Sequence, residues 1–512
     1  MNKRIRIRSL CSKWLGIFLL VGLSACGGSS DTTSSDSGTQ VASGKIIGFG
    51  SVVVNGIEFS RKPSLVADDR VILPFENNTS ASEATLRLGM NVNIRGTINS
   101  ATGKGEYESI EFQPDLRGPL DAGSIDISTN TLTVMGRKVQ VEANTAFDGG
   151  INDLAEISQT NPELEISGNL DDNIGILTAT RIARKAPDFN ALPEKIVQIK
   201  GQIAAANLIS SSFTINTGTG TFSVSFTSDA LGSKTTSDDI VVGSVFEVKG
   251  ILNGTAITAS RIEKKNAVDA EADDHVNLKG SANGGVVDNT FTINGPNGAI
   301  SINTSAASFR KDGTGATAAI VTPGTTLEIE GVLQIDGTVA ATEVHLEVEK
   351  NVKLEGNVAG AYSAGILTLN GVPVTIGAST RLLDQSGETL DLTAIVAGDH
   401  LQIVGLFDRI TNKVTASEVK RTSPRDVTIV QGPVTAVASP NLTLFGMITV
   451  DTSTANSATG FEDERSVPTV TFANRDAFFA ALTSDGFTVV KAKGTMVGTT
   501  MNASDVDLEH AQ

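Results

Sequence analysis

Cysteine and histidine side chains build many catalytic and metal sites, and this chain has few of either. It contains two cysteines and four histidines in 512 residues. No histidine has a second one nearby, and the four are expected in a linker, a strand, a turn and the C-terminal tail: His275, His345, His400 and His510. We therefore interpret them as solvated polar residues, not as zinc ligands or catalytic bases.

Two short motifs come close to catalytic signatures. Residues 361–365 (AYSAG) have the spacing of a nucleophile elbow, but a strand is expected at 366–369, where that motif requires a helix. We interpret this motif as a hairpin turn. Residues 103–105 (GKG) lack both the upstream glycine and the following serine or threonine of a phosphate-binding loop.

A third segment has the composition of a calcium loop. Residues 169–175 (NLDDNIG) alternate oxygen ligands, but the glycine comes one position late and the twelfth position is Thr180, not glutamate. We interpret the segment as a hairpin turn and the acidic stretch 269–274 as a solvated linker. The sequence thus predicts no metal and no other cofactor.

The clearest chemical signal lies at the amino terminus. Residues 1–13 are basic, residues 14–23 are apolar and small residues follow, which is the order of a secretory signal peptide. The apolar run is too short for the ~20 residues of a membrane-spanning helix. Leu23-Ser24-Ala25-Cys26 resembles the lipobox of bacterial lipoproteins. An ordinary leader with a chance cysteine is the alternative.

The lipobox resemblance implies a specific modification. The signal peptide, residues 1–25, would be removed, and Cys26 would carry diacylglycerol on its sulfur and an acyl chain such as palmitate on its amine. Gly27 in place of aspartate implies sorting to the outer membrane, on its periplasmic or cell-surface side. Residues 26–43 are rich in Gly, Ser and Thr and would form a flexible tether of roughly 20–25 Å. With Cys11 removed and Cys26 lipidated, no disulfide is expected in the body.

Charge excludes one class of partner. The formal net charge is −17, and the predicted leader carries five bases and no acid, so its removal leaves −22. Such an acidic body argues against binding to a phosphate backbone. We interpret the bases in 181–185 as a solvated strand end and predict no nucleic-acid partner.

Four sequence marks recur in the same order about every 75 to 80 residues, and such periodicity predicts tandem units. One is a glycine in an apolar strand: Gly44, Gly118, Gly201, Gly280, Gly356 and Gly432. Another is a hairpin centred on glycine, with Asn-Gly in three copies: Asn55-Gly56, Asn294-Gly295 and Asn370-Gly371. A later strand ends in glycine (Gly96, Gly168, Gly250, Gly331, Gly405 and Gly494), and a last strand such as 179–182 follows.

The marks predict six β repeats, at 44–115, 116–186, 197–265, 276–350, 352–422 and 427–512. Each has five strands with a loop or short helix between the third and fourth, and in the sixth repeat this slot expands into a helical insertion at 476–482. That order is typical of a small all-β barrel of the OB type, with small β-sandwiches as the alternative. Units of about 75 residues are marginal alone, so we expect neighbours to pack end to end.

Residues 48–56 (GFGSVVVNG) resemble the start of an uncharacterised bacterial lipoprotein family built from tandem copies of a domain of unknown function. The resemblance covers 44–510 and implies no catalytic residue. We expect a non-enzymatic, lipid-anchored cell-envelope scaffold or adhesin-like binding protein whose protein or glycan ligand is unknown. The alternative is an envelope enzyme or accessory subunit acting on polysaccharide. The predicted body has no tryptophan and only Tyr107 and Tyr362, which argues against the aromatic platforms of sugar sites.

Overall fold

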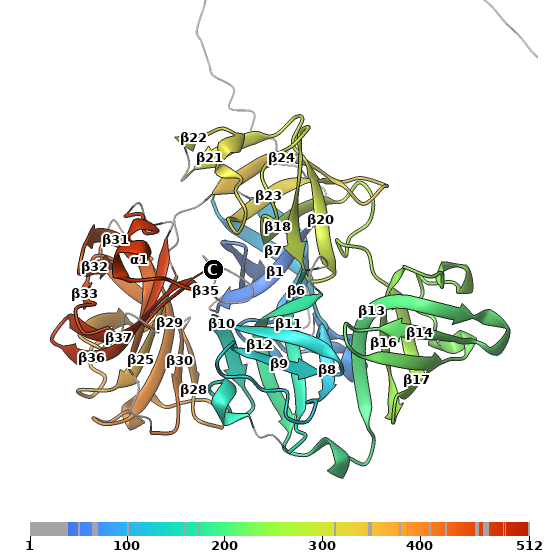
Figure 1. The fold of residues 1–512 in the computed structure, drawn as a ribbon, viewed down its shortest axis with the longest axis horizontal. Coiled ribbons are helices and arrows are strands. Elements are labelled where there is room, and N and C mark those ends of the chain that lie inside the picture. The colour runs from blue at the N-terminus through green and yellow to red at the C-terminus, as the bar shows by residue number, and fades with distance from the viewer. Residues whose placement is uncertain are drawn as a thin grey trace, which may run out of the picture. The chain divides into compact units, whose positions relative to one another are not determined.

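In the computed structural model the described residues are 39–509, with gaps at 50–51, 64–69, 100–101, 158–159, 172–174, 312–313, 347–350, 378–379, 387, 409–410, 425–427, 456–459, 464–469, 485 and 487. The described chain is built almost entirely of β-strands (Figure 1). The predicted all-β class is therefore confirmed.

The first barrel shows how five strands close on themselves. The first strand pairs antiparallel with the second and with the fourth, the second pairs with the third, and the third pairs parallel with the fifth. The fourth and fifth form an antiparallel hairpin that completes the circuit. We call this circuit barrel 1; its strands are β1 (Gln40–Gly48), β2 (Val52–Val54), β3 (Ile57–Arg61), β6 (Asn91–Asn99) and β7 (Lys104–Phe112).

The same strand order recurs further along the chain. Barrel 2 contains β8 (Leu116–Pro119), β9 (Thr131–Val134), β10 (Arg137–Asp148), β11 (Glu163–Asp171) and β12 (Ile176–Ala186). Barrel 3 contains β13 (Ile196–Asn207), β14 (Ser212–Asn216), β15 (Thr221–Ser225), β16 (Val245–Asn253) and β17 (Ala256–Lys264). Barrel 4 contains β18 (His275–Ser281), β19 (Thr290–Gly295), β20 (Gly298–Asn303), β23 (Thr326–Leu333) and β24 (Val339–Leu346).

Two more circuits follow toward the C-terminus. Barrel 5 contains β25 (Asn351–Asn357), β26 (Ile366–Leu369), β27 (Val372–Thr375), β29 (His400–Asp408) and β30 (Lys413–Arg421). Barrel 6 contains β31 (Ile429–Ala438), β32 (Asn441–Leu444), β33 (Ile448–Asp451), β36 (Val489–Val497) and β37 (Thr500–Glu509). The predicted OB-like strand order is confirmed, whereas the number of repeats and their boundaries stay predictions.

Short elements fill the slot between the third and fourth strands. They are the strands β4 (Val71–Leu73), β5 (Asn78–Ala81), β21 (Ser308–Lys311), β22 (Thr314–Gly315), β28 (Arg381–Leu383), β34 (Phe461–Asp463) and β35 (Val470–Thr471), and the 3-10 helices η1 (Pro74–Glu76), η2 (Glu83–Thr85), η3 (Leu154–Glu156), η6 (Ser228–Ala230), η7 (Ser237–Asp239), η8 (Ala318–Ile320) and η9 (Leu392–Ala394). Two further 3-10 helices lie elsewhere: η4 (Phe189–Ala191) and η5 (Leu208–Ser210). The insertion predicted at 476–482 contains helix α1 (Arg475–Ala480).

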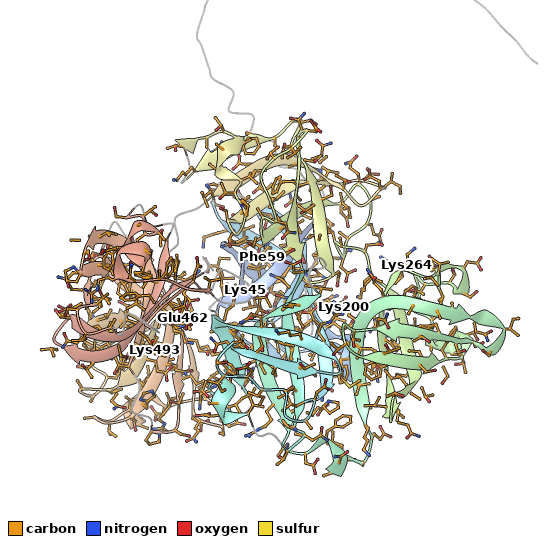
Figure 2. The ribbon with its side chains drawn as sticks, in the orientation of Figure 1. Lys45, Phe59, Lys200, Lys264, Glu462 and Lys493 are labelled. Atoms are coloured by element: carbon orange, nitrogen blue, oxygen red, sulfur yellow. The ribbon has the colours of Figure 1, made fainter. Side chains whose placement is uncertain are left out.

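Alternation along each strand builds the barrel interiors. In β3 the burial pattern alternates, and Phe59, labelled in Figure 2, is 1% exposed. In β11, Leu164 and Ile166 belong to the core of barrels 2 and 3. Helix α1 adds Phe478, whose ring lies 5.1 Å from that of Phe461 between centroids. Packing of these apolar side chains is the main favourable term for folding, because the described body contains no cysteine.

The recurring first-strand glycine and the hairpin that follows it are physically coupled. In barrel 1 a Cβ placed at Gly44 would overlap the side chain of Asn55, the first residue of the tight turn. In barrel 5 a Cβ at Gly356 would overlap Asn370 in the same way. Both turn asparagines have positive φ, at 52°, as a type I′ hairpin requires. The glycine is thus needed because the turn residue lies directly over the first strand.

The recurring glycine of the fourth strand is required for a different reason. In each barrel the ladder between the fourth and fifth strands shifts register at this glycine, as at Ser167/Gly168 in barrel 2. A Cβ at Gly168 would overlap the carbonyl oxygen of Thr178 across the ladder. The sequence mark is therefore the signature of a β-bulge at which two backbones come close together.

One predicted hairpin is displaced. In barrel 4 the Asn294-Gly295 dipeptide was expected at the turn, but Gly295 pairs with Gly298 and the two-residue turn is Pro296–Asn297. Proline fixes φ near −65° and so favours the first central position of a tight turn. Asn294 consequently lies on a strand, where its side chain is available to a neighbouring surface.

First strands join the barrels in pairs. β1 pairs parallel with β18, β8 meets β13 at Arg117–Gln198, and β25 pairs antiparallel with β31. Barrel 1 therefore shares a sheet with barrel 4, barrel 2 with barrel 3, and barrel 5 with barrel 6. Barrels 2 and 3, and barrels 5 and 6, are neighbours along the chain, as expected, whereas barrel 1 departs from that expectation by pairing with barrel 4. A free first-strand edge gains backbone hydrogen bonds by pairing with another first strand.

Candidate functional site

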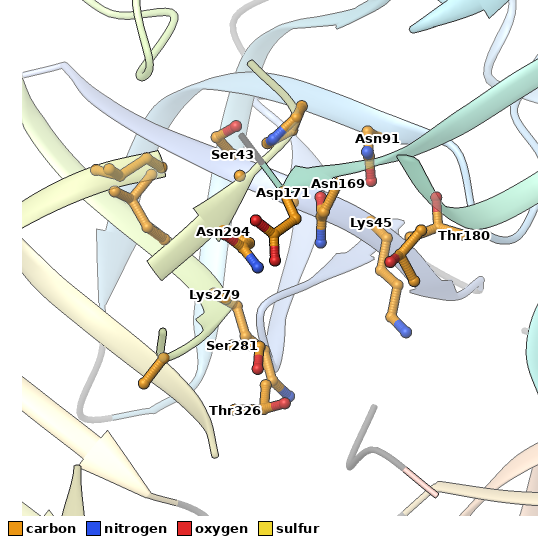
Figure 3. A pocket seen from close by; sticks show the side chains of 18 of the residues that line it. Ser43, Lys45, Asn91, Asn169, Asp171, Thr180, Lys279, Ser281, Asn294 and Thr326 are labelled. Carbon is orange, nitrogen blue, oxygen red and sulfur yellow. The ribbon is translucent and has the colours of Figure 1, made fainter. Parts of the chain in front are cut away.

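A hollow of about 370 Å³ has a mixed polar and apolar lining, and we call it the amide hollow (Figure 3). Segments from three barrels line it: β1 of barrel 1, β11 and β12 of barrel 2, and β18 and β19 of barrel 4. Its polar side chains are Ser43, Lys45, Asn55, Asn91, Glu142, Asn169, Asp171, Thr178, Thr180, Lys279, Ser281, Asn283, Asn294 and Thr326. Five of these are asparagines, so neutral hydrogen-bonding groups dominate.

The lining asparagines are held in place by backbone groups. Asn55 is 3% exposed, and its Nδ2 donates to the carbonyl oxygen of Ser43 at 3.0 Å and to the side-chain oxygen of Asn277 at 3.0 Å. Asn91 Nδ2 donates to the carbonyl oxygen of Gly168 at 2.8 Å. These bonds cross from barrel 1 to barrels 4 and 2, so they fix the walls of the hollow.

The opposite wall comes from barrels 2 and 4. Asn283 Nδ2 donates to Asn294 Oδ1 at 2.8 Å, which orients Asn294 on β19. Asn169 and Asp171 lie at the end of β11, two residues apart, so strand alternation places both on one face. Figure 3 shows Asn294, Asn169 and Asp171 projecting into the same space.

The charges of the amide hollow are balanced. Two lysines and two carboxylates line it: Lys45, Lys279, Glu142 and Asp171. Its serines and threonines are accompanied in the lining by these four charged residues and by no histidine. Among the described residues no group of three or more His, Cys, Asp or Glu side chains is arranged to hold a metal ion.

A second hollow of about 270 Å³ is strongly charged. Arg95 of barrel 1 lines it together with residues of barrel 3 and the linker after it: Lys234, Arg261, Glu263, Lys264, Lys265 and Asp269. Lys265 Nζ lies 3.4 Å from Asp269 Oδ2 and 3.4 Å from Glu263 Oε2. Burial opposes its charge, but Glu247 and Asp269 hold the pKa of Lys265 above its usual range.

Two carboxylates of this second hollow have opposite shifts. Burial, and then the charge of Asp269, raise the pKa of Glu111. Burial acts against the charge of Asp269 as well, but Lys265 and Lys200 lower its pKa. Asn93 also donates to Asp269, at 3.2 Å. Asp269 is exposed, as predicted for a solvated linker, and it also contacts barrel 1 through Asn93 and the end of barrel 3 through Lys265.

The strand faces that point away from the barrel cores carry buried ion pairs, which we call the ionic layer. Lys200, labelled in Figure 2, lies 2.7 Å from Asp115 Oδ1, and the two side chains are 8% and 4% exposed. Arg117 Nε lies 2.8 Å from Glu163 Oε1. Arg181 Nη1 lies 2.9 Å from Glu165 Oε1. The Lys200–Asp115 pair joins barrel 3 to the segment before barrel 2, whereas the two arginine pairs lie within barrel 2.

The structure also corrects the prediction made for residues 181–185. The side chain of Arg181 is 3% exposed, and besides Glu165 it donates to Asp148 Oδ2 at 2.9 Å. The interpretation of 181–185 as a solvated strand end is therefore wrong at this residue. Its charge is committed to two carboxylates, which leaves it unable to serve as a phosphate contact.

The prediction that His400 is a solvated turn residue is wrong. His400 is the first residue of β29 and is 1% exposed. Its Nδ1 lies 2.8 Å from Asn357 Oδ1 and its Nε2 lies 3.2 Å from Glu355 Oε1. Gln402 donates to the other oxygen of Glu355 at 2.9 Å. The His400–Glu355 pair is closed to solvent and joins β25 to β29 within barrel 5.

The remaining predicted site residues are placed as follows. Cys26, the predicted lipidation site, and His510 lie outside the described residues. His275 and His345 lie on β18 and β24 and both take part in interactions. The 361–365 motif is a tight turn, as predicted, since Ala364 and Gly365 have positive φ and Ser363 bridges to Ile366.

The segment 169–175, which resembles a calcium loop in composition, contributes two residues to the amide hollow. Residues 172–174 lie outside the described residues, but Asn169 and Asp171 line the amide hollow. Sequence reasoning missed the amide hollow as a site, because its walls come from residues as far apart as Ser43 and Thr326. The isolated asparagines on otherwise alternating strands were the only signal. In the described part of the chain no helix has the length and apolar character needed to cross a bilayer.

Comparison with known proteins identifies the repeats. The family described as "Domain of unknown function (DUF5666)" matches residues 117–183, 200–263, 281–345 and 355–420, which together make up about half of the chain. The comparison with curated proteins gave no match. Among solved structures, "drosophila Unr CSD456" matches with 10% identity and a TM-score of 0.11, over 44% of this chain and 97% of its own. With its family model repeated in four successive barrels, the chain belongs to the DUF5666 family.

Proposed function

We propose that this protein is a non-enzymatic binding protein of the cell envelope, held at the outer membrane by lipid on Cys26, and that the amide hollow is its ligand site. The observation that carries the proposal is the lining of that hollow. Three barrels contribute side chains to one cavity of about 370 Å³, within the ~300–1,000 Å³ typical of small-molecule sites. A cavity shared by several units is a common place for a ligand.

Binding without catalysis is supported by the chemistry of the lining. Amides and hydroxyls donate and accept hydrogen bonds but are poor proton carriers near neutral pH. The one carboxylate that the close-up labels, Asp171, faces asparagines and no histidine (Figure 3). Such a surface can orient a polar molecule, and no histidine is among the residues that line it.

The experiment uses the full mature chain. Saturation-transfer NMR with a fixed set of polar metabolites, short peptides and oligosaccharides measures binding, and product analysis of the same samples over hours measures turnover. We expect at least one saturable ligand and no product. Turnover of an oligosaccharide would contradict the proposal and favour a polysaccharide-acting enzyme.

The anchor is proposed from the lipobox and is tested separately. Replacement of Cys26 by serine removes the sulfur that would carry diacylglycerol, so we expect loss of fatty-acid labelling and a shift from the membrane to the soluble or unprocessed fraction. Multiple acyl chains hold a protein stably where one does not, so the shift should be large. Unchanged partition of the Cys26→Ser protein would refute the anchor. Recovery of the native protein with the inner membrane would refute the sorting inferred from Gly27.

A further inference from the structure

We infer that the ligand of the amide hollow is a short, uncharged saccharide that bridges barrels 2 and 4. This inference rests on the proposed binding function and names the class of ligand. It starts from the balance of donors and acceptors. Each asparagine side chain offers an accepting oxygen and two donating N–H groups, and each sugar hydroxyl both donates and accepts. A phosphate or a free carboxylate only accepts, so it would satisfy the amide N–H groups but would face the lining carboxylates of Glu142 and Asp171 with no donor to offer them.

The charge of the lining also favours an uncharged ligand. Lys45 and Lys279 balance Glu142 and Asp171 within the lining, so the hollow has no excess of either sign. A cavity built for an anionic ligand would carry an excess of cations that face it. An uncharged ligand does not need such an excess of cations.

The apolar part of the lining suits the carbon face of a sugar ring. Ile47, Pro296 and Pro323 contribute this part, whereas Leu278 and Ile300 behind them are 2% and 3% exposed. Aliphatic and proline side chains can cover C–H groups as aromatic rings do, although they bury less area per residue. The volume is at the small end of the ~300–1,000 Å³ range, which limits the ligand to a short saccharide.

Asn294 is the residue on which specificity should depend most. Its Oδ1 accepts from Asn283 at 2.8 Å, which fixes the amide so that its Nδ2 faces the hollow. In the described part of the chain that Nδ2 has no hydrogen-bond acceptor assigned to it. Asn169 and Asp171 face the same space from β11, so a ligand hydroxyl placed there would contact both barrels.

Barrel 3 offers a matched control. Asn216 occupies the place of Asn294 in its own barrel, at the end of β14 before the hairpin loop. Its side chain is exposed and lines none of the hollows described above. Asn216→Ala therefore removes the same chemical group from an equivalent strand without touching the amide hollow.

The test is calorimetric titration of the full mature chain with glucose, galactose, N-acetylglucosamine, maltose and cellobiose, with gluconate and inorganic phosphate as charged comparators. We expect at least one neutral sugar to bind and the anions not to bind. Asn294→Ala should weaken that sugar by about tenfold, the effect of one lost hydrogen bond of about 1.4 kcal/mol, and Asn216→Ala should leave it unchanged. Asn169→Ala, in barrel 2, should weaken it too, which guards against a local folding defect in barrel 4.

The outcomes separate this inference from the proposed function. Binding of phosphate or gluconate in place of the sugars, or sugar binding that Asn294→Ala and Asn169→Ala leave intact, overturns the saccharide inference. If a peptide or metabolite from the NMR set binds and is weakened by Asn294→Ala while no sugar binds, the binding function stands and the saccharide inference fails. If none of these probes binds, both fail.

Discussion

The half-buried carboxylate of Asp148 should make barrel 2 less stable in acid, and Asp148→Asn should remove that dependence. Asp148 lies at the end of β10, and its Oδ2 accepts from Arg181 Nη2 at 2.9 Å. Burial by itself would raise the pKa of this carboxyl, but Arg181, with help from Lys420, lowers it to about 2 from an ordinary 3.8.

The magnitude follows from this shift. One pKa unit corresponds to about 1.4 kcal/mol, so the charged form of Asp148 contributes about 2 kcal/mol to the stability of the folded barrel. Because the folded pKa is lowered, this contribution is fully present above pH 4 and is lost as the pH falls toward 2. Asp148→Asn should therefore cost about 2 kcal/mol at pH 7 and almost nothing at pH 2. Arg181 keeps Glu165 as a partner, at 2.9 Å, so the variant does not leave an unpaired buried cation.

Hydrogen exchange followed by mass spectrometry measures this local effect in the intact chain, which is preferable to a global melt because a string of barrels does not unfold as two states. Peptides from 137–186 are compared at pH 7, 4.5 and 2.5 after correction for intrinsic exchange. Asp238→Asn is the control, since Asp238 is exposed in barrel 3. An equal loss of protection at every pH, or no loss at pH 7, would refute the electrostatic reasoning.

Two further predictions concern a hairpin and a partner. Gly371→Val places a β-branched residue at φ +75°, with its Cβ 2.9 Å from the carbonyl oxygen of Gly498. We therefore expect barrel 5 to lose about 1–3 kcal/mol of stability, measured by hydrogen exchange across β26 and β27. Full protection in the variant would show that the turn is not rigid. The mature chain should not bind single-stranded DNA at physiological salt, because its predicted charge is −22 and Arg181 is buried in ion pairs. Submicromolar binding that weakens steeply with added salt, measured by fluorescence anisotropy, would contradict this prediction.

The barrels could be predicted from the sequence because their signals are local. Gly44 and the Asn55-Gly56 turn are about ten residues apart, and their contact within one barrel repeats along the chain. Gly168 marks a bulge that any copy needs at that point of the ladder. A local steric requirement gives the same residue at the same spacing, so repetition alone reveals it.

The surfaces between barrels could not be predicted in this way. Alternation places Glu165, Lys200 and His400 on the strand face opposite the core, and by composition such a face looks solvated. All three are buried in polar contacts, Glu165 with Arg181, Lys200 with Asp115 and His400 with Glu355. The polarity of a strand face therefore shows that it is not core, but does not show whether water or other polar side chains cover it.

The candidate site illustrates the same division. The sequence by itself determined the all-β class, the strand order, the tight turns and the bulges, because each depends on backbone sterics within some tens of residues. Only the tertiary structure decided that barrel 1 pairs with barrel 4 and that Asn169 and Asn294 face one cavity. These choices depend on which polar groups satisfy one another across more than a hundred residues, and no local pattern encodes such pairings.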